Sequence, residues 1–347
     1  MNTTINDLTV LFLSILLEAL PFVMLGSIIA SVISLFVSDK LLYRFIPKNR
    51  AGGLIAASLM GLIFPVCDCT VVPIMRRLIR KGLPSSLAVT FMCAVPIINP
   101  AVILSTAWAF TNLPHIIWLR LLVGMSVAIA TGFAIGKLTR EANPLLNEKD
   151  LLTTPEHKGC SCANHECAPD VHECTCSHES HDAGRREGCA CGNAGHQHGR
   201  YVTESRWAKV SDKIHRFISH TAGEFIDSSA LIVIGAFLSS VIQIWAPRTI
   251  MYPVAASPTA SVGVMMGFTY LISLCSNADA FVAKSFCGIF TTGSVVAFLT
   301  FGQMIDLKNT VMLLGFFKKR FIIITIITVA ILCFSWGVII NILGRGL

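Results

Sequence analysis

The amino-acid sequence predicts an all-α polytopic membrane protein made of two inverted repeats. Of its 347 residues, 54% are hydrophobic and only 14% are charged, and the mean hydropathy is +0.68. A soluble domain carries about 25% charged residues, so this chain lacks the polar side chains that would cover a surface facing water. Several apolar runs also reach the roughly 20 residues that a helix needs to cross a bilayer. These runs are too long for the buried strands of a large soluble α/β enzyme.

Eight apolar segments define the expected elements. In chain order they are residues 8–37, 52–75, 83–110, 116–136, 228–245, 257–286, 288–317 and 321–343. Six are expected to cross the membrane, three in each repeat. The second and the sixth are interrupted by polar residues, and each is expected to form a re-entrant or broken helical hairpin. No lysine or arginine precedes the first run, which is about twice as long as the core of a signal peptide, so we expect a span there.

Basic residues orient these segments. Clusters at residues 40–50 and 76–81 flank the first hairpin. A single crossing would leave one cluster outside, against the positive-inside rule, whereas a hairpin keeps both in the cytoplasm. The middle of this hairpin, residues 64–73, combines prolines with polar residues. Such a break survives at membrane depth only where protein buries it or where it lines a cavity.

The chain is predicted to divide into three parts. Residues 1–138 form the first membrane repeat, residues 139–207 a flexible cytoplasmic loop, and residues 208–347 the second membrane repeat. A shift of about 210 residues brings residues 67–69 onto 277–279 and residues 96–99 onto 306–309. The second half then runs in the opposite orientation. Inverted repeats whose broken helices meet near the midplane are common among transporters.

The first hairpin carries two thiols beside a carboxylate. Cys67, Asp68 and Cys69 lie between Pro65 and Pro73. A charged side chain in a span costs at least ~2.5–3.5 kcal/mol, so Asp68 is expected to face the protein interior and to meet a cation or a proton. Thiolates select soft or borderline ions such as Cu(I), Zn(II) and As(III). The alternative is that both cysteines are small apolar core residues.

Polar residues in three other segments are expected to join this site. Cys275, Asn277 and Asp279 form the counterpart in the second hairpin. Asp306 falls deep inside the seventh segment, or alternatively at a span end beside a short loop. Asn99 lies between two prolines that kink the third segment, although such a kink also arises for packing alone. The predicted transport pathway therefore comprises Cys67, Asp68, Cys69, Asn99, Cys275, Asn277, Asp279 and Asp306.

The central loop is predicted to bind metal. Residues 157–198 hold seven cysteines and seven histidines and almost no apolar residue that would build a core. Six of the seven cysteines occur as Cys-x-Cys pairs without the regular spacing of a zinc finger, which indicates a flexible chelator of Zn(II) or Cu(I). Disulfides are disfavoured because the basic clusters put the loop in the reducing cytoplasm. The expected ligands are Cys160, Cys162, Cys167, Cys174, Cys176, Cys189, Cys191, His165, His172, His178, His181, His196 and His198.

The chain resembles the predicted-permease family that includes the YraQ and ArsP proteins. The motifs are Phe-Pro-Val-Cys-Asp-Cys at 64–69, Gly-Leu-Pro at 82–84, Pro-Ile-Ile-Asn-Pro at 96–100, Leu-Cys-Ser-Asn-Ala-Asp-Ala-Phe at 274–281 and Gly-Gln-Met-Ile-Asp at 302–306. The resemblance implies transport, with trivalent organoarsenical efflux in the ArsP branch. The cysteine- and histidine-rich loop is similar to the branch described as copper/zinc efflux transporters. Cys-Asp-Cys stands where many relatives have Cys-Ser-Cys or Cys-Glu-Cys, which favours a divalent cation over a neutral arsenical.

These features predict a multi-pass permease of a bacterial plasma membrane that exports Zn or Cu. The expected partners are the metal or metalloid ion, the lipid bilayer, and an accessory membrane subunit or a second copy, without nucleic acid. No cofactor is required, and Zn or Cu is the substrate or a loop ligand. Metalloid efflux and metal uptake are the alternatives within transport. A membrane-anchored metal sensor is the alternative outside it, and an enzyme is disfavoured because no His-Glu-x-x-His motif occurs.

Overall fold

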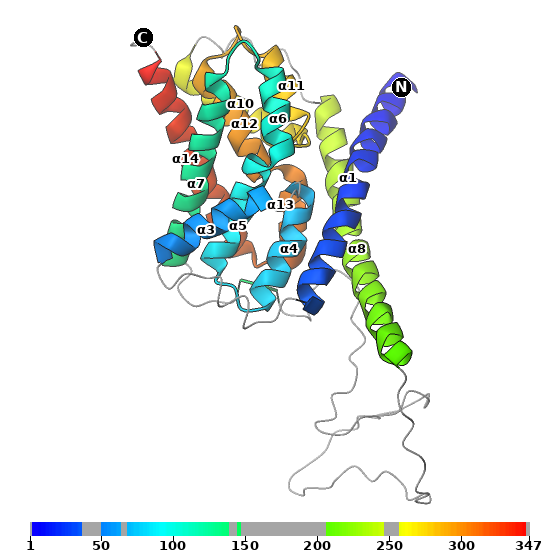
Figure 1. Cartoon of the computed structure of the whole chain (residues 1–347). Coiled ribbons are helices and arrows are strands. Elements are labelled where there is room, and N and C mark those ends of the chain that lie inside the picture. Colours follow the sequence, from blue (N-terminus) through cyan, green and yellow to red (C-terminus); the bar gives the residue numbers. More distant parts are fainter. Residues whose placement is uncertain are drawn as a thin grey trace, which may run out of the picture. The chain divides into compact units, whose positions relative to one another are not determined.

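The computed structural model is built from α-helices (Figure 1). It describes residues 2–36, 50–63, 68–138, 144–146, 206–245 and 257–344. Within these ranges there is no β-strand, only two isolated β-bridges. The chain divides into a large unit, Met1–Thr154 with Ile214–Leu347, and a small one, Pro155–Lys213. The account below concerns the large unit, because the structure describes little of the small one.

In the described part of the chain, four long helices enclose two runs of short helices in the sequence. In chain order they are α1 (Asn2–Phe36), α3 (Arg50–Ile63), α4 (Asp68–Arg80), α5 (Ser85–Ile98), α6 (Pro100–Ala109), α7 (His115–Leu138), α8 (Arg206–Trp245), α10 (Pro258–Ile272), α11 (Asp279–Ser285), α12 (Thr292–Met304), α13 (Leu307–Phe316) and α14 (Lys319–Leu343). Four stretches are long and apolar enough to cross a membrane, namely Asn6–Ile29, His115–Leu138, Phe217–Ile244 and Lys319–Leu343. The bent pair α5 and α6 adds a fifth candidate span. The prediction of an all-helical, multi-pass membrane protein is confirmed.

Two predicted spans are broken rather than continuous. Residues 83–110 form α5 and α6, which meet at 41° across Asn99. The Asn99 side chain accepts a hydrogen bond from the backbone N–H of Ala101 at 3.0 Å, and Pro100 cannot continue the hydrogen bonding of α5. Residues 288–317, expected as one helix, instead form α12 and α13. Asp306 stands between them in an extended conformation, and its carboxylate caps α13 by accepting the Asn309 N–H at 2.7 Å.

The second predicted hairpin also takes shape as two helices. α10 ends at Ser273, which adopts a left-handed conformation with φ 51°, and α11 begins at Asp279. Two side chains of α8 donate hydrogen bonds to the last carbonyl groups of α10. Ser239 donates to the carbonyl oxygens of Leu271 and Ile272, and Gln243 donates to that of Ile272. The first hairpin corresponds to α3 and α4. Residues 64–67, which join them and include Cys67, lie outside the described residues.

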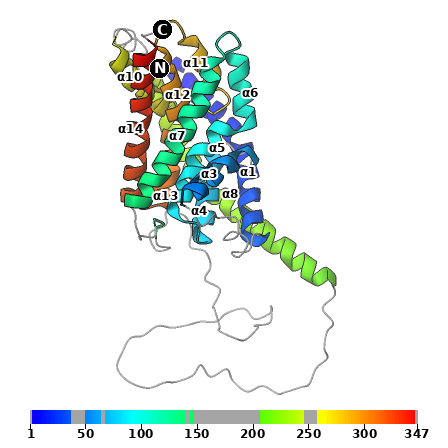
Figure 2. The same cartoon turned by 60° about the vertical axis from the view of Figure 1, so that its left-hand side comes forward.

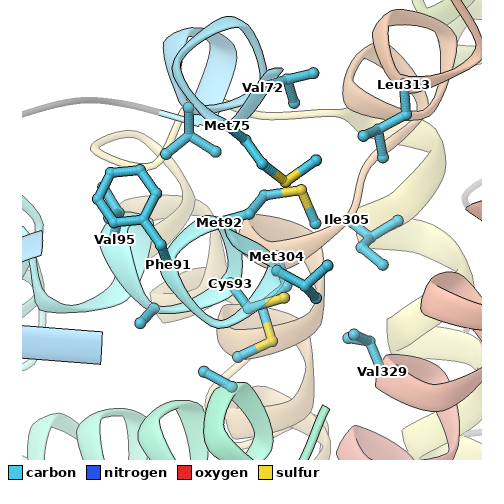
Figure 3. Close-up of a cluster of buried hydrophobic side chains, with 14 of the residues drawn as sticks. Val72, Met75, Phe91, Met92, Cys93, Val95, Met304, Ile305, Leu313 and Val329 are labelled. Carbon is cyan, nitrogen blue, oxygen red and sulfur yellow. The ribbon is translucent and has the colours of Figure 1, made fainter. Parts of the chain in front are cut away.

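The core lies around α5 and α12. Every residue of α5 from Leu87 and of α12 from Gly293 is buried, as expected for helices that are apolar on all sides. α5 packs on α3 and α7, α12 packs on α10 and α14, and the two central helices contact each other. Figure 3 shows methionine side chains from three helices, Met75, Met92 and Met304, meeting in this core. In contrast, α1 and α14 expose many large apolar side chains, as lipid-facing helices do.

Small residues set two close helix contacts. A Cβ at Gly26 of α1 would lie 2.4 Å from Thr70 Cβ of α4, and a Cβ at Gly235 of α8 would lie 3.0 Å from Lys308 Cα of α13. Real Cβ atoms do not approach other atoms as closely as the first of these distances. Glycine therefore lets α1 and α8 approach the backbones of the two short helices that carry polar side chains, as small residues do between membrane helices.

Candidate functional site

Three helix breaks bring polar side chains together inside the bundle. Asp68 begins α4, Asp306 precedes α13, and Cys275 lies in the turn between α10 and α11. All three are buried, with exposed fractions of 1% for Asp68, 0% for Asp306 and 8% for Cys275. Lys308 interacts electrostatically with each of them and with Cys69. The polar cluster formed by Asp68, Cys69, Cys275, Asp306 and Lys308 therefore combines residues from both halves of the chain.

The helix that presents each residue explains why it points inward. α4 and α13 are each short and largely buried on the side that faces the core. α4 contacts α13 directly, and α6 contacts α11. Figures 1 and 2 both show α4 and α13 in one half of the bundle and α6 and α11 in the other. The hairpin helices α4 and α11 thus begin near the middle and extend toward opposite ends.

Lys308 supplies the positive charge of the polar cluster. Its Nζ lies 3.7 Å from Asp306 Oδ2, and both side chains are buried. The other carboxylate oxygen of Asp306 already accepts the Asn309 N–H. With Asp68 and Asp306 ionised and Lys308 protonated, the cluster carries one net negative formal charge. It therefore favours an added cation or proton over an anion.

Several oxygen atoms of this region lack a hydrogen-bond partner. They are both carboxylate oxygens of Asp68, Asp306 Oδ2, and the amide oxygen of Asn309. An unpaired buried carboxylate is costly, because burial removes its water without replacing the hydrogen bonds. Neither Cys69 nor Cys275 forms a disulfide. The cluster thus places soft sulfur donors beside hard oxygen donors, and several of these oxygen atoms have no hydrogen-bond partner.

A second polar group surrounds Asp279. Arg120 Nη2 of α7 lies 2.9 Å from Asp279 Oδ2, and Gln303 Nε2 of α12 donates to the same oxygen at 2.8 Å. Gln303 also donates to the Ser276 carbonyl oxygen at 3.0 Å, and Arg120 donates to the Thr106 hydroxyl. Through the bond from Gln303 to Ser276, this network contacts the turn that carries Cys275. Asp279 is therefore paired directly through Oδ2, whereas its Oδ1 has no hydrogen-bond partner.

Sequence reasoning missed Arg120 and Gln303. The signal for Arg120 was present, because an arginine inside an apolar run requires a buried partner just as an aspartate does. Asn99 and Asn277, both predicted, have different surroundings. Asn99 caps α6, so its amide oxygen is engaged, whereas the amide oxygen of Asn277 has no hydrogen-bond partner. The structure gives Asn99 a local structural role and leaves Asn277 beside the Asp279 network.

The predicted loop ligands cannot be located. Residues 157–198, with their thirteen predicted metal ligands, lie outside the described residues. Among the residues that are described, no group of three or more His, Cys, Asp or Glu side chains is arranged to hold a metal ion. Cys93 and Cys333 lie in the apolar core, as expected for structural cysteines (Figure 3 for Cys93).

α8 links the two helices of the polar cluster. Arg76, on α4, lies 3.7 Å from the Asp227 carboxylate of α8. The same guanidinium lies over the Phe316 ring at the end of α13, 4.3 Å from its centroid. Residue Lys318, just after α13, also donates its N–H to the Pro144 carbonyl oxygen at 2.9 Å. The ends of α4 and α13 away from the cluster are thereby held to α8 and to the segment that follows α7.

Comparison with known proteins identifies the family. Residues 4–342 match the family ArsP_1, described as "Predicted permease". The "UPF0718 protein YcgR" of Bacillus subtilis (strain 168) is 33% identical over 331 residues, which cover 95% of this chain and 96% of the relative. A Streptococcus mutans serotype c protein, described as a "two-component membrane permease complex subunit", is 30% identical over 313 residues, or 90% of this chain and 88% of that one. No solved structure matches. This chain therefore belongs to the predicted permease family ArsP_1 and is a multi-pass membrane permease rather than an enzyme.

Proposed function

We propose that the protein exports a thiophilic metal ion, Zn(II) or Cu(I), from the cytoplasm, and that the polar cluster binds the ion during passage. The observation that carries this proposal is that four buried residues, Asp68, Cys69, Cys275 and Asp306, all interact electrostatically with the buried Lys308. Two thiols suit soft and borderline ions, and the unpartnered carboxylate oxygens suit a positive charge. Cys67, adjacent to Asp68 in sequence, is a further ligand in this proposal.

Lys308 has a defined part in this mechanism. In the empty protein its ammonium group offsets part of the charge of Asp68 and Asp306, which stabilises the buried cluster. An arriving cation competes with this ammonium group for the same carboxylates. Lys308 therefore compensates part of the charge of the two carboxylates before the ion binds and again after the ion leaves. Because the cluster without the ion is not strongly destabilised, release of the ion is favoured as well as its binding.

The order of the helices supports an inverted-repeat mechanism. Within the described residues, each half has a long helix, four short helices and a second long helix: α1, α3, α4, α5, α6 and α7 in one, and α8, α10, α11, α12, α13 and α14 in the other. Asn99 and Asp306 cap corresponding helices, α6 and α13. We infer that the two halves are related by inversion and expose the polar cluster alternately to the two sides.

The central loop fits the same direction of transport. We propose that residues 157–198 capture or sense Zn(II) or Cu(I) in the cytoplasm and deliver it to the bundle. A synthetic peptide of this segment should bind several ions with release of protons, because thiols lose protons when they ligate a metal. Deletion of the segment should weaken transport without abolishing it, since the pathway lies in the helices. Complete loss of transport in a normally inserted deletion variant would contradict this division of roles.

A membrane partner is also part of the proposal. The Streptococcus mutans relative is described as one subunit of a two-component permease complex. We propose that this chain too works with an accessory membrane subunit or with a second copy. Purification in mild detergent followed by mass measurement of the intact complex distinguishes a monomer, a homodimer and a heteromeric assembly.

Efflux of a trivalent metalloid is the second candidate function. It is favoured by the positive charge of Lys308 inside the polar cluster and by the absence, among the described residues, of a preformed group of three metal ligands. A neutral trivalent arsenical would bind the thiols without competing with Lys308. Metal uptake is the third reading, with the loop as the acceptor on the cytoplasmic side.

The deciding experiment is transport by the purified protein in proteoliposomes. Zn(II), Cu(I), Cd(II), arsenite and a trivalent organoarsenical are tested separately, in both directions. The proposal requires that Zn(II) or Cu(I) moves and that Asp68→Asn stops it, while Cys93→Ser, a thiol removed from the apolar core, does not. Movement of arsenicals alone would support the second candidate instead.

A further inference from the structure

A carboxylate on the exposed side of α1 interacts electrostatically with the polar cluster. Glu18 is in the middle of the apolar span Asn6–Ile29, and its side chain is exposed. It interacts electrostatically with Asp68 and with Cys275. A charged side chain that faced lipid at this depth would cost at least ~2.5–3.5 kcal/mol. Glu18 therefore requires a proton, water, a cation or a polar partner on the exposed side of α1.

The backbone beside Glu18 has the same requirement. Pro21 lies inside α1 and has no N–H, so the carbonyl oxygen of Leu17 lacks its usual helical donor. A carbonyl oxygen without a donor is as unfavourable in lipid as an unpaired side chain. The carbonyl oxygen of Leu17 and the carboxylate of Glu18 are thus neighbouring polar groups on α1. The other exposed residues of this helix are largely apolar, among them Leu13 and Met24.

The packing of α1 on α4 brings the segment around Glu18 beside α4. Ala19 and Val23 of α1 are buried in the core, and Gly26 lies directly against Thr70 of α4. Glu18 flanks this buried stripe on its exposed side. On the exposed side of α1, Glu18 is therefore a carboxylate that borders the helix on which Asp68 lies.

We propose that Glu18 lines a water-filled access route and is the first carboxylate to meet the cation on its way to Asp68. The inference rests on the proposed function, because it assumes a cationic substrate. The negative charge of Glu18 attracts the ion to the mouth of the route and raises the rate at which it reaches the buried cluster. Glu18 is thus a residue of the route and not of the binding cluster itself.

Water access is tested by thiol labelling of the full chain in membrane vesicles. Glu18→Cys is compared with Leu17→Cys, which lies at the same depth and is 62% exposed. A charged, membrane-impermeant thiol reagent is used, and modification of the substituted position is read by peptide mass spectrometry. The inference requires Glu18→Cys to react at least about tenfold faster than Leu17→Cys, because thiolates form in water and not in lipid. Equal rates, or no reaction at position 18, would overturn it.

Ion kinetics provide the second arm. Glu18→Gln should raise the Zn(II) concentration for half-maximal transport about five- to tenfold and make it less dependent on salt, with the maximal rate within about twofold of wild type. Glu18→Asp should restore most of the loss, and Leu17→Gln should behave as wild type. Unchanged kinetics in Glu18→Gln would overturn the route. If the wild-type protein moves neither Zn(II) nor Cu(I), the proposed function fails, whereas the labelling arm still reports whether water reaches Glu18.

Discussion

Arg120 on α7 and Asp279 at the start of α11 form an ion pair of 2.9 Å although 159 residues separate them in sequence. Both side chains are almost fully buried. A buried ion pair is strongly destabilised when one partner is removed, because the remaining charge has neither water nor a counter-ion. This pair therefore joins the two halves of the chain beside the turn that carries Cys275.

The first prediction concerns the stability of this contact. Arg120→Met should destabilise the folded protein by about 3–5 kcal/mol, and Asp279→Asn should also destabilise it. The double variant should lose less than the sum of the two single losses, because neither charge is left unpaired. Thermal unfolding of the purified protein in detergent measures this, and the exposed Lys319→Met serves as the matched control. Strict additivity in the double variant would contradict a direct ion pair.

The burial of two aspartates in the polar cluster could be predicted from the sequence, because it follows from the residues next to each of them. Asp68 and Asp306 were found because each interrupts an apolar run, and an ionisable group at that depth must turn inward. The pairing of Arg120 with Asp279 was not found, because no spacing rule links residues so far apart. The separation of α12 from α13 was missed because an apolar average over 288–317 hides two extended residues at Ile305 and Asp306.

The second prediction separates binding from folding at the start of α4. Asp68→Asn should lower ion binding and transport at least about 100-fold and leave thermal stability close to that of wild type, because a buried charge is removed while Asp306 remains as the counter-ion of Lys308. Cys69→Ser should lower transport while the protein still inserts. Cys93→Ser, buried in the core of α5, is the matched control and should transport normally. Isothermal calorimetry and proteoliposome flux provide the two readouts.

The third prediction distinguishes the charge of Asp306 from its capping role. Asparagine caps a helix about as well as aspartate, so Asp306→Asn should retain the cap on α13 and lose only the carboxylate beside Lys308. It should abolish transport with a smaller fall in the unfolding temperature than Lys308→Met, because Asp68 remains as a counter-ion of Lys308. Asp306→Ala loses the cap as well and should cost about 1 kcal/mol or more beyond Asp306→Asn. Normal transport by Asp306→Asn would remove Asp306 from the pathway.

The fourth prediction tests the close approach of α1 to α4. Gly26→Ala adds a Cβ that would lie 2.4 Å from Thr70 Cβ, so α1 must move away from the helix that carries Asp68 and Cys69. The expected cost is about 1–3 kcal/mol, measured as a lower unfolding temperature. Gly267→Ala on α10 is the matched control, because nothing lies within 4 Å of its added Cβ. Equal stabilities of the two variants would contradict tight packing at Gly26.

The last prediction uses Lys308 to decide between the two candidate substrates. Removing its charge in Lys308→Met leaves Asp68 and Asp306 without their buried counter-ion, so the empty protein should lose about 3–5 kcal/mol of stability. A cation that binds at those carboxylates no longer competes with the ammonium group. Zn(II) or Cu(I) should therefore bind the variant at least about tenfold more tightly than it binds wild type, since removing one nearby positive charge is worth about 1.4 kcal/mol or more.

The readout is the thermal stabilisation of Lys308→Met by each ligand. A ligand at 100 times its dissociation constant stabilises the folded state by about 2.7 kcal/mol, so tighter binding appears as a larger rise in unfolding temperature at the same concentration. Lys308→Arg, which retains the charge, and the exposed Lys319→Met should respond to the metal as wild type does. A neutral trivalent arsenical should stabilise Lys308→Met and wild type equally. If Zn(II) and Cu(I) stabilise neither protein while the arsenical stabilises both, the cluster serves the metalloid.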